Sequence, residues 1–249
     1  MIKNLHLVVL KMINNLLTIS LSTSNTIDIL IAVFLLISAY LIGSIPFGLV
    51  VGKGIAHIDI REHGSKNIGS TNAIRVLGKK LGFLVFFLDV FKGMFIILLV
   101  KILRINGVYN APVDDIFFGV FAILGHGFPV FLNFKGGKVV ATSLGVIFVV
   151  SPLAAILCLI AFYLTLKISG YVSLASTFAT LTVFATALVL YFVGIEPTNF
   201  LEYFIVKTSL TSLILISCTA VLIIVKHRKN YIRLIHGTEN NFKKKKQAQ

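Results

Sequence analysis

The stretch VVATSLGVIFVVSPLAAILCLIAFYLTLKI, residues 139–168, decides how many times this chain crosses a membrane. It is almost entirely apolar, and Lys167 is its only charged residue. One long tilted helix would leave Lys167 on the far side from residue 139, whereas two short helices would return the chain to its starting face. Because proline removes a helix donor and restricts the residue before it, we expect two helices that meet at Ser151-Pro152.

Other apolar segments predict further membrane helices. The chain is 57% hydrophobic and 13% charged, unlike an ordinary soluble domain. An apolar run of about 20 residues crosses a hydrocarbon core of roughly 30 Å as a helix. The runs here are continuous rather than alternating, which favours helices over a barrel. We therefore expect an all-α polytopic membrane protein with seven transmembrane helices: the pair above and residues 29–51, 81–103, 116–131, 171–194 and 203–225.

The basic residues orient these helices. The net charge is +14, but the lysines and arginines gather in residues 53–80 and from Lys226 onward. Residues 104–115 and 195–202 carry little positive charge. By the positive-inside rule, the N-terminus is expected outside and the C-terminus in the cytoplasm. Membrane topology thus explains the charge without a nucleic-acid partner.

The chain divides into three parts by composition. In residues 1–28, Lys11, Asn14 and Asn15 interrupt an apolar pattern. We expect this extension to form an interfacial amphipathic helix, with a cleaved signal peptide as the alternative. Residues 29–239 form the membrane domain, and residues 240–249 form a basic tail.

A long polar loop lies between the first two predicted helices. Residues 53–80 are rich in small hydrogen-bonding groups, and a long ordered loop tends to carry function. Arg75 closes this run and suits a bidentate phosphate contact, although positive-inside bias alone could have placed it there. The candidate ligand-binding residues are Gly64, Ser65, Asn67, Gly69, Thr71 and Asn72.

The sequence Gly136-Gly137-Lys138 stands where a cytoplasmic segment enters a helix. Glycines let backbone N–H groups approach an anion, the helix start adds unpaired N–H groups and its dipole, and Lys138 adds a charge. Phosphate is the natural ligand of such a turn. The alternative is a flexible turn with two snorkelling lysines.

Two further pairs of polar residues have helical spacing. His227 and Asn230 are three apart at the foot of the last predicted span, so we expect them to share a helix face and orient a substrate group. Lipid headgroup contact is the alternative. Asp89 and Lys92 lie inside the second span and are expected to form an ion pair. His126 is expected to be a supporting donor near the glycine turn.

These residues fall within six motifs: GSIPFG (43–48), DIREHGSKNIGSTNAIRVLGKKLG (59–82), LDVFKG (88–93), GHGFPVFLNFKGGK (125–138), VSLAS (172–176) and HRKNYIRLIHGTE (227–239). In this order and at these separations, they resemble the PlsY-type bacterial acyl-phosphate:glycerol-3-phosphate acyltransferases. The resemblance covers residues 29–239.

This resemblance implies a monomeric enzyme of the bacterial inner membrane with its site on the cytoplasmic face. It would move a fatty acyl group from acyl phosphate to the sn-1 hydroxyl of glycerol 3-phosphate, forming lysophosphatidic acid in phospholipid biosynthesis. Membrane lipids are the other expected partners; no cofactor, metal or nucleic acid is expected. The implied catalytic residues are Ser65, Arg75, Lys138, His227 and Asn230, and the implied phosphate-binding residues are Gly64, Asn67, Gly69, Thr71, Asn72, Gly136, Gly137 and Ser176.

Two positions depart from the family pattern. Val139 stands where the family usually has the last glycine of GGKG. A β-branched residue would be strained there if φ were positive, whereas a position in the first turn of a helix would accept it. Lys229 stands where glutamate is usual, which predicts the loss of a carboxylate with a structural role.

Other functions remain as alternatives. A transporter or channel would continue its polar residues through the spans and break helices near the midplane, for which Asp89, Lys92 and the Ser151-Pro152 break are the available signals. A membrane scaffold would use the basic tail to bind anionic lipid. A rival acyltransferase design pairs a histidine with an aspartate five positions later; His57 and Glu62 have that spacing but the wrong carboxylate.

Overall fold

The computed structural model describes residues 26–196, 198–199 and 202–242. Apart from an isolated bridge between Ile195 and Val206, the regular structure in these residues is helical. The interfacial helix was predicted for residues 1–28, of which 1–25 lie outside the described residues and 26–28 begin α2; the lysine run at 243–246 also lies outside the described residues. The main helices are α2 (Thr26–Ser44), α4 (Ser70–Ile105), α5 (Ile116–Gly127), α6 (Val140–Val150), α7 (Pro152–Ser169), α8 (Val172–Val193) and α9 (Leu210–Lys226); the short ones are α3 (Phe47–Ile55), η1 (Val130–Leu132), η2 (Glu202–Ile205) and α10 (Arg228–Ile235).

The helices have the apolar surface of an integral membrane protein. Helices α2, α4, α7 and α8 are each long and apolar enough to cross a membrane, and α9 passes the same test together with α10. Helices α5 and α6 are shorter but also apolar. Large apolar side chains such as Phe34 and Phe192 are 69% and 74% exposed, as expected for residues that face lipid. The predicted all-α membrane fold is confirmed.

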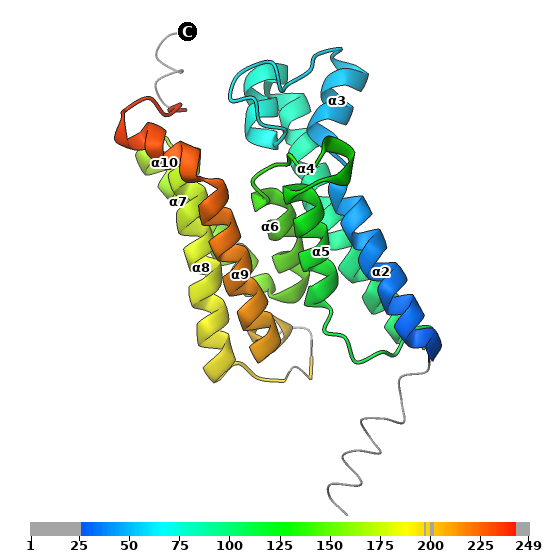
Figure 1. Ribbon diagram of the computed structural model, residues 1–249. Helices are drawn as coiled ribbons and strands as arrows, with labels where there is room; N and C mark the ends of the chain where they lie inside the picture. The colour runs from blue at the N-terminus through cyan, green and yellow to red at the C-terminus, as the bar shows by residue number, and fades with distance from the viewer. Residues whose placement is uncertain (1–25, 197, 200–201, 243–249) are drawn as a thin grey trace, which may run out of the picture.

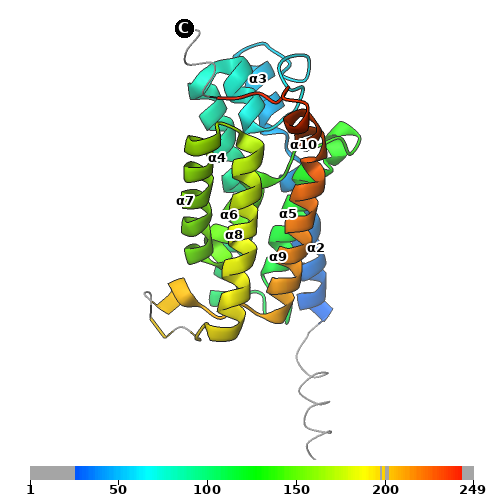
Figure 2. The same ribbon diagram turned by 90° about the vertical axis from the view of Figure 1, so that its left-hand side faces the viewer.

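The main helices run alternately up and down, so that distant segments meet at the same end (Figure 1). Helix α3, the start of α4 and helix α10 lie together at one end in both views (Figure 2). The connections from α4 to α5 and from α8 to α9 lie at the other end. We call the end that carries α3 and α10 the polar end.

The predicted break within residues 139–168 is present. Helix α6 ends at Val150, and Pro152 is the first residue of α7. The Ser151 N–H donates to the Ile147 carbonyl at 2.8 Å, and the Ala155 N–H donates to the Ser151 carbonyl at 3.1 Å. Proline is accommodated because its missing donor falls in the first turn of α7.

The predicted single helix over residues 29–51 is wrong. Helix α2 ends at Ser44, and α3 begins at Phe47 after Pro46. Proline has no N–H to continue the α2 hydrogen bonds, and it restricts Ile45 before it. The break sets α3 apart from α2 and places it against the polar loop.

Two other predicted boundaries also shift. Helix α4 starts at Ser70 rather than at residue 81, with a kink at Gly78, whose φ of 85° is outside the helical range. The kink separates a short segment at the polar end from the apolar span. Tyr203 lies in η2, and α9 starts only at Leu210, where the Ser209 side chain caps it.

Small residues bring neighbouring helices into backbone contact. A Cβ on Gly43 would lie 2.1 Å from the Ala122 carbonyl oxygen, so α2 and α5 cannot separate to admit a side chain there. A Cβ on Gly93 would lie 2.2 Å from the Thr142 carbonyl oxygen, between α4 and α6. Close approach through small residues is a general way to pack helices in membranes. The packing fixes α2 against α5 and α4 against α6 beneath the polar end.

Candidate active site

Asn72 organises the polar loop that carries Ser65. Its Oδ1 accepts a hydrogen bond from the Ser65 N–H at 2.8 Å, and its Nδ2 donates to the Ile60 and His63 carbonyls at 2.8 and 3.2 Å. Gly64 has φ 60°, and a Cβ there would lie 2.4 Å from Asn72 Oδ1. The buried amide of Asn72, predicted to bind phosphate, therefore contacts the loop backbone and fixes where Ser65 lies.

The same loop ends in the open start of helix α4. Asn67 Oδ1 accepts a hydrogen bond from the Gly69 N–H at 2.9 Å. Gly69 is the N-cap of α4 and provides no side-chain cap, so Ser70 and Thr71 begin the helix without one. Uncapped N–H groups and the helix dipole favour an anion at this position. Arg75 follows within the next turns, on the same short segment before the Gly78 kink.

The glycine turn at residues 136–138 rests on the end of α5. The Gly137 N–H donates to the His126 carbonyl at 3.0 Å. A Cβ on Gly136 would lie 2.3 Å from that carbonyl oxygen, and one on Gly137 would lie 2.2 Å from His126 Nε2. Both glycines are therefore required by contact with His126. The turn leads Lys138 to the start of α6.

Val139 adopts the positive-φ conformation in which a β-branched residue was expected to be strained. It is the N-cap of α6, with φ 60° and ψ −2°, and it is fully buried. A β-branched residue is strained in this region of backbone space. Its side chain lies against α5, because a Cβ on Gly127 would lie 2.9 Å from Val139 Cγ1. Burial of the Val139 side chain offsets part of the backbone strain.

Charged residues from distant segments gather around Lys138. Burial lowers the pKa of the Lys138 ammonium to about 8; the nearby Glu239 carboxylate opposes this shift, and the positive charges of Arg233 and Arg75 add to it. These groups come from the α6 entrance, α10, the segment after α10 and α4. They can act on one ammonium only because the fold brings the four segments together.

His227 lies at the junction of α9 and α10, which meet at a bend of 48°. The side chains of His227 and Asn230 are both buried. His227 Nδ1 lies 2.8 Å from the Ile223 carbonyl oxygen. Because a carbonyl only accepts, Nδ1 carries the proton. Burial lowers the pKa of His227 to about 4, so the imidazole is neutral and Nε2 is left as an acceptor. His227 is both the C-cap of α9 and the N-cap of α10, and the Asn230 N–H donates to the His227 carbonyl at 2.8 Å. The two residues therefore keep their helical spacing at the start of α10 rather than on α9.

Glu239 and Arg233 belong to this cluster but were not singled out from the sequence. The carboxylate of Glu239 accepts hydrogen bonds from Asn230 Nδ2 at 2.8 Å and from Arg233 Nε at 2.7 Å. Lys229, in contrast, is exposed, and the carboxylate of this region comes from Glu239. The sequence signal that could have identified Glu239 is the GTE (237–239) at the end of the last motif.

The segment after α10 crosses to the start of α8 and covers Arg75 (Figure 2). The Phe242 N–H donates to the Gly170 carbonyl at 2.9 Å. The Phe242 ring centre lies 5.3 Å from the Arg75 guanidinium carbon, within range of a cation–π contact. The first residues of the predicted tail thus pack on the membrane domain.

Ser176 lies in the first turns of α8, beside α10. Its side chain is buried, as is that of Ser173 one turn earlier. The hydroxyls of Thr177 and Tyr231 are 2.7 Å apart and join α8 to α10. This contact keeps the start of α8 next to the His227 junction.

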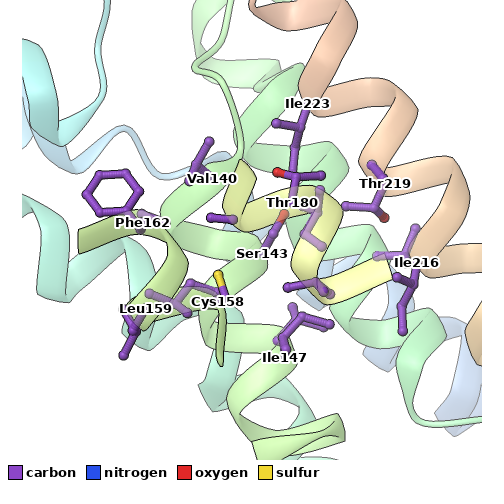
Figure 3. Close-up of a pocket in the computed structure, with 18 of the residues that line it drawn as sticks. Val140, Ser143, Ile147, Cys158, Leu159, Phe162, Thr180, Ile216, Thr219 and Ile223 are labelled. Carbon is purple, nitrogen blue, oxygen red and sulfur yellow. The ribbon is translucent and has the colours of Figure 1, made fainter. Parts of the chain in front are cut away.

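An apolar cavity lies between the helices that carry the polar cluster, and Figure 3 shows the side chains that line it. Its volume is about 110 Å³, and residues from α4 to α9 enclose it. Val140 and Ala141, in the first turn of α6, form part of its wall, so the cavity begins two residues from Lys138. Its labelled lining residues are Val140, Ser143, Ile147, Cys158, Leu159, Phe162, Thr180, Ile216, Thr219 and Ile223.

The predicted ion pair in the second span is confirmed. Lys92 Nζ lies 2.8 Å from Asp89 Oδ1, and both side chains are 2% exposed. His126 Nδ1 lies 3.4 Å from the same oxygen of Asp89. The pair therefore lies beneath the glycine turn that His126 supports.

Comparison with known proteins identifies relatives of this chain. The family model described as glycerol-3-phosphate acyltransferase matches residues 33–237. The glycerol-3-phosphate acyltransferases of Streptococcus pneumoniae strains Hungary19A-6 and G54 are each 40% identical over 211 residues, which cover 85% of this chain and 93% of the relative.

Two solved structures have the same fold. The crystal structure of PlsY (YgiH), an integral membrane glycerol 3-phosphate acyltransferase, in its glycerol 3-phosphate form is 40% identical and has a TM-score of 0.72, covering 85% of this chain and 95% of that one. Its lysophosphatidic acid form has a TM-score of 0.70 at 40% identity, with coverage of 84% and 94%. The chain therefore belongs to the glycerol-3-phosphate acyltransferase family of integral membrane enzymes.

Proposed function

We propose that this protein transfers a fatty acyl group from acyl phosphate to the sn-1 hydroxyl of glycerol 3-phosphate, forming lysophosphatidic acid for phospholipid biosynthesis. The observation that carries the proposal is the gathering of Arg75, Lys138 and His227 at the polar end, next to an apolar cavity. A cationic site next to an apolar space suits a substrate with a phosphate head and an acyl chain. The relatives named above carry the matching enzyme name.

The phosphate groups would bind among the cations and helix starts. Helices α4, α6 and α8 all begin at the polar end, and the N-cap residues Gly69, Val139 and Tyr171 provide no side-chain caps. Their first N–H groups therefore favour anions. Arg75 and Lys138 add positive charge, which offsets the repulsion between two phosphate substrates. Because Gly136 and Gly137 have no side chains, the backbone of the turn can approach one of the two phosphate substrates.

The acyl chain would enter the cavity beside α6. The cavity wall is almost wholly apolar, so burial of methylene groups there is favourable. Its edge at Val140 lies two residues from Lys138, which would put the acyl carbonyl close to the bound phosphate. The glycerol hydroxyl would then need to reach the same point from the polar side.

The reaction needs no covalent intermediate with the protein. The sn-1 oxygen forms a bond to the acyl carbon, the bond from that carbon to the phosphate oxygen breaks, and the hydroxyl proton leaves with the departing phosphate. Holding both reactants in place supplies most of the acceleration. His227 Nε2, which is free to accept, would orient the attacking hydroxyl. Ser65, Asn230 and Ser176 would hold the substrates around it.

The membrane arrangement is part of the proposal. The seven main helices would each cross the membrane once, with residue 26 outside and residue 242 in the cytoplasm. The basic residues at the polar end support this orientation, because it places them on the cytoplasmic side of the inner membrane. We propose a monomeric enzyme whose only other partners are membrane lipids.

The test is turnover by the purified protein. Incubation with acyl phosphate and glycerol 3-phosphate is expected to yield lysophosphatidic acid, and acyl-CoA in place of acyl phosphate is expected to yield none. Product from acyl-CoA alone would refute the proposed donor. No product from either donor, with correctly folded protein, would refute the acyltransferase proposal.

A further inference from the structure

The proposed reaction does not use the buried ion pair of Asp89 and Lys92. Two charged residues inside a membrane helix are expensive unless they pair, and such residues usually serve a specific purpose. Here each member of the pair also contacts another segment of the chain. Those contacts lead to the two segments that the proposed function assigns to phosphate binding.

Lys92 contacts the junction between α2 and α3. Its Nζ donates a hydrogen bond to the Ile45 carbonyl at 2.9 Å and lies 5.5 Å from the centre of the Phe47 ring. Ile45 precedes Pro46, where the regular helix hydrogen bonds stop. Lys92 therefore supplies a donor to a carbonyl at the break.

Helix α3 links this junction to the Ser65 loop, against which it packs closely. A Cβ on Gly48 would lie 1.9 Å from the Ile68 carbonyl oxygen, and one on Gly52 would lie 2.8 Å from the Ile58 carbonyl oxygen. Such close packing lets α3 and the loop move only together. The position of Ser65 thus depends on the position of the junction that Lys92 contacts.

Asp89 contacts the glycine turn through His126. One side of the imidazole faces Asp89, with Nδ1 at 3.4 Å from Oδ1. The other side faces the turn, where His126 Nε2 would lie 2.2 Å from a Cβ on Gly137. The imidazole is therefore packed between the ion pair and the turn that leads to Lys138.

We infer that Asp89, Lys92 and His126 form one buried positioning unit, which sets the Ser65 loop and the Gly136–Lys138 turn at a fixed separation. The inference rests on the proposed function, since it gives the unit its purpose. The proposed function assigns none of the three side chains a contact with substrate. His126 is the member that contacts the turn directly, so removal of its imidazole should weaken the binding of a phosphate substrate at the turn.

Two substitutions of His126 test separately the side of the imidazole that faces Asp89 and the side that faces Gly137. In His126→Asn the amide nitrogen occupies the place of Nδ1, so the contact with Asp89 is kept and the support under Gly137 is removed. In His126→Gln the amide nitrogen occupies the place of Nε2, so the support is kept and the contact with Asp89 is lost. We expect His126→Asn to raise the KM for glycerol 3-phosphate about tenfold or more with kcat changed by less than about threefold. We expect His126→Gln to raise KM less.

A change in KM without a change in kcat distinguishes a positioning role from general support of the fold. A residue that only stabilises the fold would reduce the amount of active enzyme, which lowers the apparent kcat and leaves KM unchanged. An unchanged KM in His126→Asn would therefore overturn the inference. Failure of the wild-type protein to form lysophosphatidic acid would instead refute the proposed function.

A second set of variants tests the contact itself. Gly137→Ala places a methyl group against the imidazole and should abolish measurable turnover. Adding His126→Asn makes room for the methyl group, so the double variant should recover at least about tenfold in kcat/KM and should melt at a higher temperature than Gly137→Ala. The control is Gly136→Ala, whose methyl group would meet the His126 backbone oxygen and Pro129, and which His126→Asn should not rescue. No recovery in the Gly137 pair, in rate or in melting temperature, would overturn the inference, as would equal recovery in the Gly136 pair.

Discussion

Glu239 Oε1 accepts a hydrogen bond from Asn230 Nδ2 at 2.8 Å, so one carboxylate beyond α10 fixes the amide of a predicted catalytic residue. The other carboxylate oxygen binds Arg233 Nε at 2.7 Å. This arrangement places a negative charge among the cations of the site. Glu239 thereby sets the orientation of Asn230 and limits the net positive charge that phosphate meets.

Glu239→Ala should reduce kcat/KM by about 10- to 100-fold, because a buried hydrogen bond to a charged group contributes about 1.5–3 kcal/mol. Glu239→Gln should lose less, since its amide oxygen can still accept from Asn230. Steady-state rates of lysophosphatidic acid formation measure both variants. Glu62→Ala, at an exposed carboxylate of the same end, is the control and should behave like wild type. Wild-type kinetics in Glu239→Ala would contradict the role given to this carboxylate.

The pH dependence of kcat/KM should reflect the ionisation of the Lys138 ammonium. Its pKa is lowered to about 8, chiefly by burial, so the ammonium is charged below this pH and becomes neutral as the pH rises through it. Because kcat/KM follows the ionisation of the free enzyme, it should fall above about pH 8. The second phosphate pKa, about 6, lies outside this range.

Lys138→Arg provides the check, because arginine stays charged over the whole range. Its kcat/KM should be lower than that of wild type at pH 7 but should not fall between pH 8 and 9.5. A decline at the same pH in wild type and in Lys138→Arg would assign the ionisation to another group.

At Val139, a glycine substitution should destabilise the protein less than an alanine substitution, the reverse of the usual order. Val139→Ala removes buried methyl groups but keeps a Cβ at φ 60°, and should destabilise the protein by about 1–2 kcal/mol. Val139→Gly also removes the backbone strain, which is about 1–2 kcal/mol for a residue in this conformation. The glycine variant should therefore melt at a higher temperature in detergent than the alanine variant. A lower melting temperature for Val139→Gly would show that the strain is absent.

The apolar cavity should determine how well long acyl chains are used. Val183 lies on its wall, so Val183→Phe should fill part of the space. We expect kcat/KM for a 16-carbon acyl phosphate to fall at least about tenfold relative to an 8-carbon one, since each buried methylene contributes about 0.8 kcal/mol. Val189→Phe is the matched control, because Val189 lies on the same helix and is 56% exposed toward lipid. An equal chain-length preference in both variants would place the acyl chain elsewhere.

The sequence predicted the helices better than their boundaries. Apolar runs predicted the main helices, and Pro152 predicted the break between α6 and α7. The same physical signal existed at Pro46, but the apolar residues on both sides of it favoured one continuous helix. The start of α4 was missed because its first turns are polar and a loop was the simpler interpretation of residues 70–80.

The candidate site was predictable as a set of segments but not as a set of contacts. Glycine and basic residues marked the phosphate turn and the loop before α4. The contact between Asn230 and Glu239 could not be predicted, because it depends on the turn that follows α10. The cavity also left no local pattern, since residues from six helices enclose it and each helix contributes ordinary apolar residues.

The most direct test of the cationic phosphate site is lysophosphatidic acid formation by Arg75→Ala and Lys138→Ala, each compared with an exposed lysine nearby. Loss of a preorganised charge contact should reduce turnover about 100- to 1000-fold in both variants. Lys79→Ala, on the same helix as Arg75, and Lys135→Ala, just before the glycine turn, should stay within about twofold of wild type. If Arg75→Ala and Lys138→Ala are inserted and folded yet turn over at the rates of these controls, the two cations do not form the phosphate site and the account is wrong.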